Sequence, residues 1–169
     1  MENIITLQIV GFKNSGKTTL INHWVKTIKA AGLSVIVIKH HGHGANLAMP
    51  DERKDSMQYL ASGADASIVS GAGVTQYMLQ EQLELPGLMR LAKAEQPDII
   101  LIEGFKTAMY PKAILVKEEE EWEKLQDLSD IQLVVGLGTD SGYPQIVSRE
   151  KQTDLANWLL TWIKERRAT

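Results

Sequence analysis

The chain has 169 residues, of which 44% are hydrophobic, and this is enough apolar material for one domain but too little for two. Its 18 basic and 21 acidic residues give a formal charge of −3, so its overall field does not favour binding to nucleic acid or to an anionic membrane. The absence of cysteine excludes disulfides, thiolate metal sites and a cysteine nucleophile. We therefore expect a single domain over residues 1–169.

The apolar segments are all too short to cross a membrane, which takes roughly 18 consecutive apolar residues. The first of them, Ile4–Val10, is not preceded by a basic leader. We expect a cytoplasmic protein without a membrane partner.

Short runs rich in β-branched residues recur along the chain, and each has the length of a strand that is buried on both faces. They are Ile4–Val10, Ser34–Ile38, Ala66–Val69, Val74–Leu79, Ile99–Ile102, Lys112–Val116 and Ile131–Val135. Amphipathic helical patterns lie between several of these runs, strongly at 20–28 and 155–163 and more weakly at 53–62, 85–95 and 119–128. This alternation predicts a three-layer α/β domain with helices on both faces of a mostly parallel sheet.

One pair of runs breaks the alternation. Only the turn Ser70–Gly73 separates Ala66–Val69 from Val74–Leu79, which predicts an antiparallel hairpin near residues 66–79. We expect this hairpin to make the sheet mixed.

The clearest motif is Gly11–Thr18, which fits the phosphate-binding pattern G-x-x-x-x-G-K-[ST] between a strand and an amphipathic helix. Glycines let consecutive backbone N–H groups turn toward phosphate oxygens, and the helix points its positive end at the same charge. Such a P-loop implies a nucleoside triphosphate, with Lys17 at the β and γ phosphates and Thr18 on Mg²⁺. The predicted nucleotide-binding residues in this segment are Gly11, Lys13, Asn14, Ser15, Gly16, Lys17, Thr18 and Thr19.

A P-loop site needs an acidic group near Mg²⁺, usually at the end of a second apolar strand. Glu103 ends the run Ile99–Ile102, and it could hold a metal-bound water or position an attacking water. We assign catalysis to Lys17 and Glu103. Asp55 is a further candidate metal ligand, although an acid in the first turn of a helix is an equally good reading of it.

Three histidines after the second strand, His40, His41 and His43, leave two interpretations open. Imidazoles bind transition metals, but no carboxylate or thiolate partner is apparent, so a phosphate-sensing or substrate-binding loop is as plausible. Asp140, in a glycine-rich turn after the last predicted strand, could accept hydrogen bonds from guanine. No Asn-Lys-x-Asp sequence supports a guanine preference independently.

The chain resembles the MobB family of molybdopterin-guanine dinucleotide biosynthesis proteins. The resemblance rests on Gly11–Thr19, on Lys39-His40, on Lys54-Asp55-Ser56 with the following Ser62–Ala66, and on Glu103–Lys106. Arg53 stands where glycine is expected in that family, and beyond Lys106 only the general order of elements matches.

The resemblance implies a homodimeric, weakly hydrolytic GTP-binding accessory protein of molybdenum cofactor synthesis. Such a protein would assist the molybdopterin guanylyltransferase MobA, and molybdopterin is a further candidate contact. Two other P-loop classes compete with this interpretation. A small-molecule kinase normally closes an arginine-bearing lid, for which the chain offers no arginine cluster, and a metallochaperone-type GTPase would use the histidine loop but would be expected to have cysteine.

Overall fold

The computed structural model describes residues 4–41, 47–136, 142–146, 148 and 151–168. The chain divides into two compact units, one of Met1–His40 with Met89–Thr169 and the other of His41–Leu88. We describe each unit by itself. The expectation of a single domain over residues 1–169 stays a prediction.

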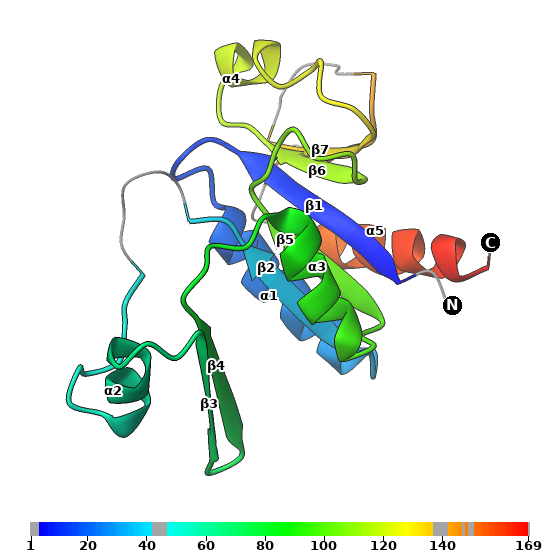
Figure 1. The fold of residues 1–169 in the computed structure, drawn as a ribbon. Helices are drawn as coiled ribbons and strands as arrows, with labels where there is room; N and C mark the ends of the chain where they lie inside the picture. Colours follow the sequence, from blue (N-terminus) through cyan, green and yellow to red (C-terminus); the bar gives the residue numbers. More distant parts are fainter. Residues whose placement is uncertain (1–3, 42–46, 137–141, 147, 149–150, 169) are drawn as a thin grey trace. The chain divides into compact units, whose positions relative to one another are not determined.

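The first unit is built on a six-stranded sheet in the order β2-β5-β1-β6-β7-β8 (Figure 1). The strands are β1 (Ile5–Gly11), β2 (Val35–Lys39), β5 (Ile99–Glu103), β6 (Lys112–Leu115), β7 (Ile131–Val135) and β8 (Gln145–Ile146). Every neighbouring pair runs parallel. The mostly parallel α/β fold predicted from the alternation of runs is therefore confirmed.

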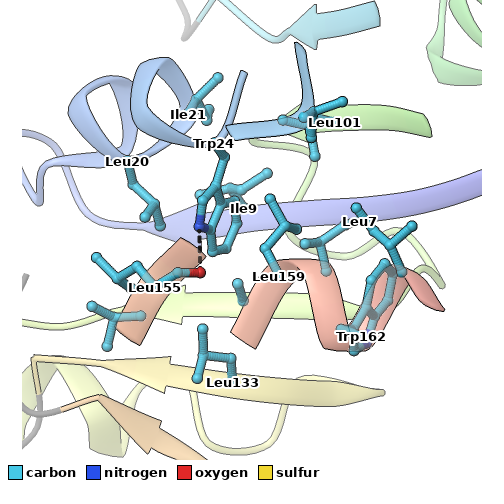
Figure 2. Packing of buried hydrophobic residues seen from close by; sticks show 14 of the residues in the cluster. Leu7, Ile9, Leu20, Ile21, Trp24, Leu101, Leu133, Leu155, Leu159 and Trp162 are labelled. Atoms are coloured by element: carbon cyan, nitrogen blue, oxygen red, sulfur yellow. Dashed lines mark hydrogen bonds between the residues drawn. The ribbon is translucent and has the colours of Figure 1, made fainter. Parts of the chain in front are cut away.

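Helices α1 (Lys17–Ala30) and α5 (Gln152–Arg167) cover one face of this sheet (Figure 2). Alternate residues of β1 point toward them, because successive side chains of a strand face opposite sides. Trp24 of α1 is fully buried, and its indole N–H donates to Leu155 O at 3.1 Å, which joins the two helices. Trp158 stacks between Trp24 and Trp162, with ring centroids 5.8 and 6.0 Å away.

The opposite face carries a second apolar cluster around Val10, Ile114 and Val134, which packs against Trp122 of α4 (Glu119–Glu123). The prediction that helices lie on both faces is confirmed. Helix α4 is shorter than the pattern at 119–128 suggested, and turns follow it in which the N–H groups of Leu125 and Gln126 both donate to Trp122 O.

The second unit contains α2 (Asp55–Ala61) and the hairpin of β3 (Ala66–Gly71) and β4 (Val74–Leu79). The antiparallel hairpin is confirmed, but the expectation that it would make the main sheet mixed is wrong. Its two strands pair with each other along their whole length and form a two-stranded sheet of their own. The boundary between the two units falls inside α3 (Leu85–Ala94). Within the described parts of the chain, no helix has the length and apolarity that a membrane span requires.

Candidate functional site

The predicted phosphate loop and Glu103 lie at the same edge of the first unit's sheet. Strand β5 is flanked by β1 and β2, and the register pairs Glu103 with Ile9 on one side and with Lys39 on the other. Strand β1 ends at Gly11, two residues after Ile9, and the loop begins there. Because the three strands are parallel, their carboxyl ends form one ligand-binding edge, as expected for an open α/β sheet.

The loop itself is a tight turn from the end of β1 into α1. Ser15 N donates to Phe12 O at 3.2 Å, and Asn14 and Gly16 take left-handed backbone angles, with φ of 61° and 94°. Gly16 is the N-cap of α1 and no side chain caps the helix there. The first N–H groups of a helix lack partners within it, so this start of α1 is suited to an anion.

Two glycines of the loop are required for different physical reasons. Gly16 needs its left-handed backbone, which costs a residue with a Cβ more than it costs glycine. Gly11 needs its lack of a side chain, because a Cβ there would lie 2.6 Å from Ser15 Oγ and 2.7 Å from Leu115 O. The close packing of β1 against β6 thus explains why glycine is needed at the first position of the motif.

Lys17 folds back over the loop that precedes it. Its ammonium donates to Phe12 O at 2.7 Å and to Gly11 O at 3.0 Å, with Ser15 Oγ at 3.5 Å. Burial lowers the pKa of Lys17, and the ammonium of Lys39 lowers it further, whereas the carboxylates of Glu103 and Glu121 act in the opposite direction. The positive charge is therefore held at the mouth of the loop by carbonyl dipoles, which a phosphate oxygen could replace.

Glu103 is the predicted metal ligand that ends β5, beside the strand that leads into this loop. Its side chain is 12% exposed, and Oε2 lies 3.5 Å from Lys39 Nζ, whose own side chain is 53% exposed. An ion pair that is so open on one side contributes little stability, because water screens it. Its main effect is on orientation, since it keeps the Glu103 carboxylate at the strand edge beside an exposed cation.

The turn after Glu103 connects it to the phosphate loop. Gly104 and Phe105 both have left-handed backbones, with φ of 94° and 50°, and a Cβ on Gly104 would lie 3.0 Å from His40 Cβ. The Phe105 ring packs on the His40 ring at a centroid distance of 4.5 Å. The ammonium of Lys106 lies 5.4 Å from the centre of the Phe12 ring in the phosphate loop. The segment Glu103–Lys106 thus contacts both neighbouring strand ends.

The remaining predicted residues fall into three groups. Lys13, Asn14, Thr18 and Thr19 are exposed on the loop and the first turn of α1, where a ligand could reach them. Asp55 begins α2 in the second unit, so its role as a metal ligand stays a prediction. His43 and Asp140 lie outside the described residues.

In the described part of the chain, His40 and His41 belong to no cluster of metal-ligating side chains. No group of three or more His, Cys, Asp or Glu side chains there could hold a metal ion. His40 instead packs on Phe105 in the first unit, and His41 belongs to the second unit.

Sequence reasoning missed the pairing of Lys39 with Glu103. In the sequence, Lys39 attracts notice only in the pair Lys39-His40, on which the family resemblance partly rests. The two residues are far apart in the chain, and only the parallel register of β2 and β5 brings them together. A prediction of which strands are neighbours, added to the observation that both residues end apolar runs, would have found the pair.

Comparison with known proteins decides the family. The family described as "MobB: Molybdopterin guanine dinucleotide synthesis protein B" matches residues 6–137. The chain belongs to the MobB family. The resemblance drawn from the P-loop and Glu103–Lys106 is thereby confirmed, and neither the kinase nor the metallochaperone alternative is favoured.

Relatives and solved structures of MobB proteins agree with this assignment. A protein of Bacillus subtilis named "Probable molybdopterin-guanine dinucleotide biosynthesis adapter protein" is 41% identical over 128 residues, which cover 76% of this chain and 74% of the relative. A crystal structure of Bacillus subtilis MobB is 33% identical and covers 93% of this chain and 96% of its own, with a TM-score of 0.80. A MobB homologue from Bacillus stearothermophilus is 30% identical with a TM-score of 0.76, covering 95% and 98% of the two chains. The likeness to MobB structures thus extends past Lys106, where the sequence motifs end.

Proposed function

We propose that this MobB-family chain binds Mg²⁺-GTP at Gly11–Thr18 and serves as an adapter in the synthesis of molybdopterin guanine dinucleotide. The observation that carries the proposal is the arrangement of Lys17, which holds its ammonium on the carbonyls of Gly11 and Phe12, one strand away from the carboxylate of Glu103. The names of the relatives, which describe adapter proteins of this synthesis, support it as well.

The residues at the sheet edge fit a magnesium nucleotide. The backbone at Gly11 leaves no room for a side chain, and α1 begins without a side-chain cap, so N–H groups remain for phosphate oxygens. In this proposal Lys17 exchanges its carbonyl partners for the β and γ phosphates, and Thr18 and Glu103 serve the metal directly or through water. Bound Mg²⁺ would neutralise phosphate charge during hydrolysis.

Hydrolysis should be weak. Glu103 is the proposed group for orienting the attacking water, and in the resting state it is engaged by Lys39. In this proposal Asp140 recognises the guanine base of the nucleotide. The proposal further includes a cytoplasmic homodimer that assists the guanylyltransferase MobA, with molybdopterin as a candidate contact.

The proposal is tested by calorimetry with GTP, ATP and their diphosphates, each with Mg²⁺. We expect GTP to bind more tightly than ATP, and Lys17→Ala to abolish Mg²⁺-nucleotide binding while the circular dichroism spectrum stays unchanged. Lys26→Ala is the matched control, because Lys26 is an exposed lysine on the same helix. Unchanged nucleotide affinity in Lys17→Ala would overturn the site assignment.

A second measurement addresses the adapter role. The rate of GMP transfer to molybdopterin by purified guanylyltransferase is measured with and without this chain. We expect wild-type protein to raise the rate and Lys17→Ala to leave it at the basal level. Transfer of phosphate from ATP to a small metabolite would instead favour a kinase.

A further inference from the structure

Two fully buried polar side chains lie side by side on the sheet face opposite α1 and α5. Gln8 of β1 and Lys112 of β6 are register partners, and both residues are 0% exposed. Neither residue belongs to the phosphate loop. A buried amide and a buried ammonium are costly unless they are hydrogen-bonded, so their partners indicate why they are there.

Both side chains hold the same segment, residues 104–111, which connects β5 to β6. These two strands are parallel and lie on either side of β1. A connection between parallel strands usually takes about a dozen residues or more and contains a helix that satisfies its own backbone. This connection is shorter and contains no helix or strand, so its carbonyl groups need partners from elsewhere.

Gln8 serves the beginning of the segment. Its amide Nε2 donates to Gly104 O at 2.7 Å and to Phe105 O at 2.5 Å, and both carbonyls belong to the left-handed turn directly after Glu103. The amide oxygen, Oε1, has no hydrogen-bond partner among the described residues. The two carbonyls alone therefore fix the orientation of this amide, because turning it over would place Oε1 against them.

Lys112 serves the other end of the segment. Its ammonium donates to Ala108 O at 2.6 Å and to Tyr110 O at 2.9 Å, with Ser129 Oγ at 3.3 Å. The two buried side chains thus bind carbonyl groups in different parts of the connection. Gln8 holds the residues next to Glu103, and Lys112 holds residues that are several positions further along.

We infer that Gln8 is a positioning residue for the Glu103 carboxylate. By holding the carbonyls of Gly104 and Phe105, it fixes the backbone on which Glu103 is presented at the nucleotide edge. The inference rests on the proposed function, in which Glu103 serves Mg²⁺. Residues that orient a metal ligand from behind typically change metal affinity or activity by about 10- to 100-fold when they are replaced.

The test compares Gln8→Met with Lys112→Met. Each replacement keeps an unbranched chain of similar length, and it removes the whole amide of Gln8 or the charged ammonium of Lys112. The readout is the gain in GTP affinity that Mg²⁺ provides, measured by calorimetry in full-length protein as the ratio of Kd in EDTA to Kd in Mg²⁺. We expect Gln8→Met to reduce this gain about tenfold while Kd in EDTA stays near wild type. Lys112→Met should lower the thermal midpoint but leave the gain unchanged.

If Gln8→Met fails to fold, Gln8→Asn serves as the second variant, because it keeps the amide but shortens its reach. A merely structural Gln8 would make the two methionine variants behave alike, with lower thermal midpoints and equal Mg²⁺ gains, and that result overturns the inference.

A double-variant comparison separates this inference from the proposed function. Glu103→Gln alone should remove the Mg²⁺ gain, and adding Gln8→Met to it should change the gain no further, because both act through one carboxylate. If Glu103→Gln leaves the gain intact, the proposed role of Glu103 is wrong. If Glu103→Gln removes the gain but Gln8→Met does not affect it, only the positioning role of Gln8 is wrong.

Discussion

Replacement of Gly11 by alanine tests whether the packing of β1 against β6 sets the shape of the phosphate loop. The new Cβ would lie 2.6 Å from Ser15 Oγ and 2.7 Å from Leu115 O. Ordinary contacts of a Cβ begin at about 3.4 Å, so both neighbours stand well inside the van der Waals limit. The Ser15 hydroxyl could rotate, but Leu115 O is a backbone atom of a strand that is paired on both sides.

The strain must therefore be relieved by moving the loop or by separating the two strands. Overpacking of this kind typically costs about 1–3 kcal/mol. For a chain of this size each kcal/mol lowers the thermal midpoint by roughly 2–4 °C, which calorimetric melting resolves easily. Because the loop is the softer of the two partners, we also expect GTP affinity to fall in Gly11→Ala.

Gly71→Ala is the matched control, since its Cβ would meet nothing within 4 Å and its backbone is not left-handed. That variant should melt and bind like wild type. A Gly11→Ala protein with wild-type midpoint and wild-type GTP affinity would refute the claim that the close approach to Leu115 fixes the loop.

Two further predictions concern parts of the first unit that lie away from the phosphate loop. Trp24→Phe removes the donor to Leu155 O and leaves a space between α1 and α5, so the unfolding free energy should fall by about 1–3 kcal/mol in denaturant titrations, with GTP affinity unchanged. A loss of GTP affinity would instead show that packing around Trp24 influences the phosphate loop. The Ser34 backbone N–H and hydroxyl, assisted by Arg167, hold the pKa of Asp98 below its ordinary value of 3.8, so this carboxylate contributes stability above that pH and loses it as the pH falls. The difference in unfolding free energy between wild type and Asp98→Asn should be constant above about pH 5 and shrink at lower pH, and a pH-independent difference would contradict this.

The elements that the sequence predicted best are those with a local cause. The hairpin follows from a short glycine turn between two β-branched runs, and helices α1 and α5 follow from apolar residues at helical spacing. Strand β8 was missed because it consists of only Gln145 and Ile146, too short for any periodicity. The prediction that the hairpin joins the main sheet was wrong. The sequence of a strand does not specify which other strand it pairs with.

The candidate site also contains residues that the local sequence indicates and residues that depend on the order of the strands. The phosphate loop could be proposed from the sequence alone because its motif consists of eight consecutive residues, and the contacts of Gly11 and Lys17 are compatible with that proposal. The proposed role of Glu103 needed one further step, the knowledge that parallel strands end at a common edge. Its partner Lys39 required the order of the strands as well, and no local pattern contains that order.

The hydrogen-bond partners of Gln8 and Lys112 could not be predicted from the residues next to them in the sequence, and the reason is physical. Each lies in or at the end of an apolar run that predicts a buried strand, and both are fully buried, but the run does not indicate which groups they bond to. They are needed because the connection from β5 to β6 lacks a helix, so that its carbonyls must be satisfied by the strands that it passes. A polar residue inside a central strand is therefore informative about the connection that covers it. In this MobB-family chain it is informative about the residue that immediately precedes that connection, Glu103, on which the proposed chemistry depends.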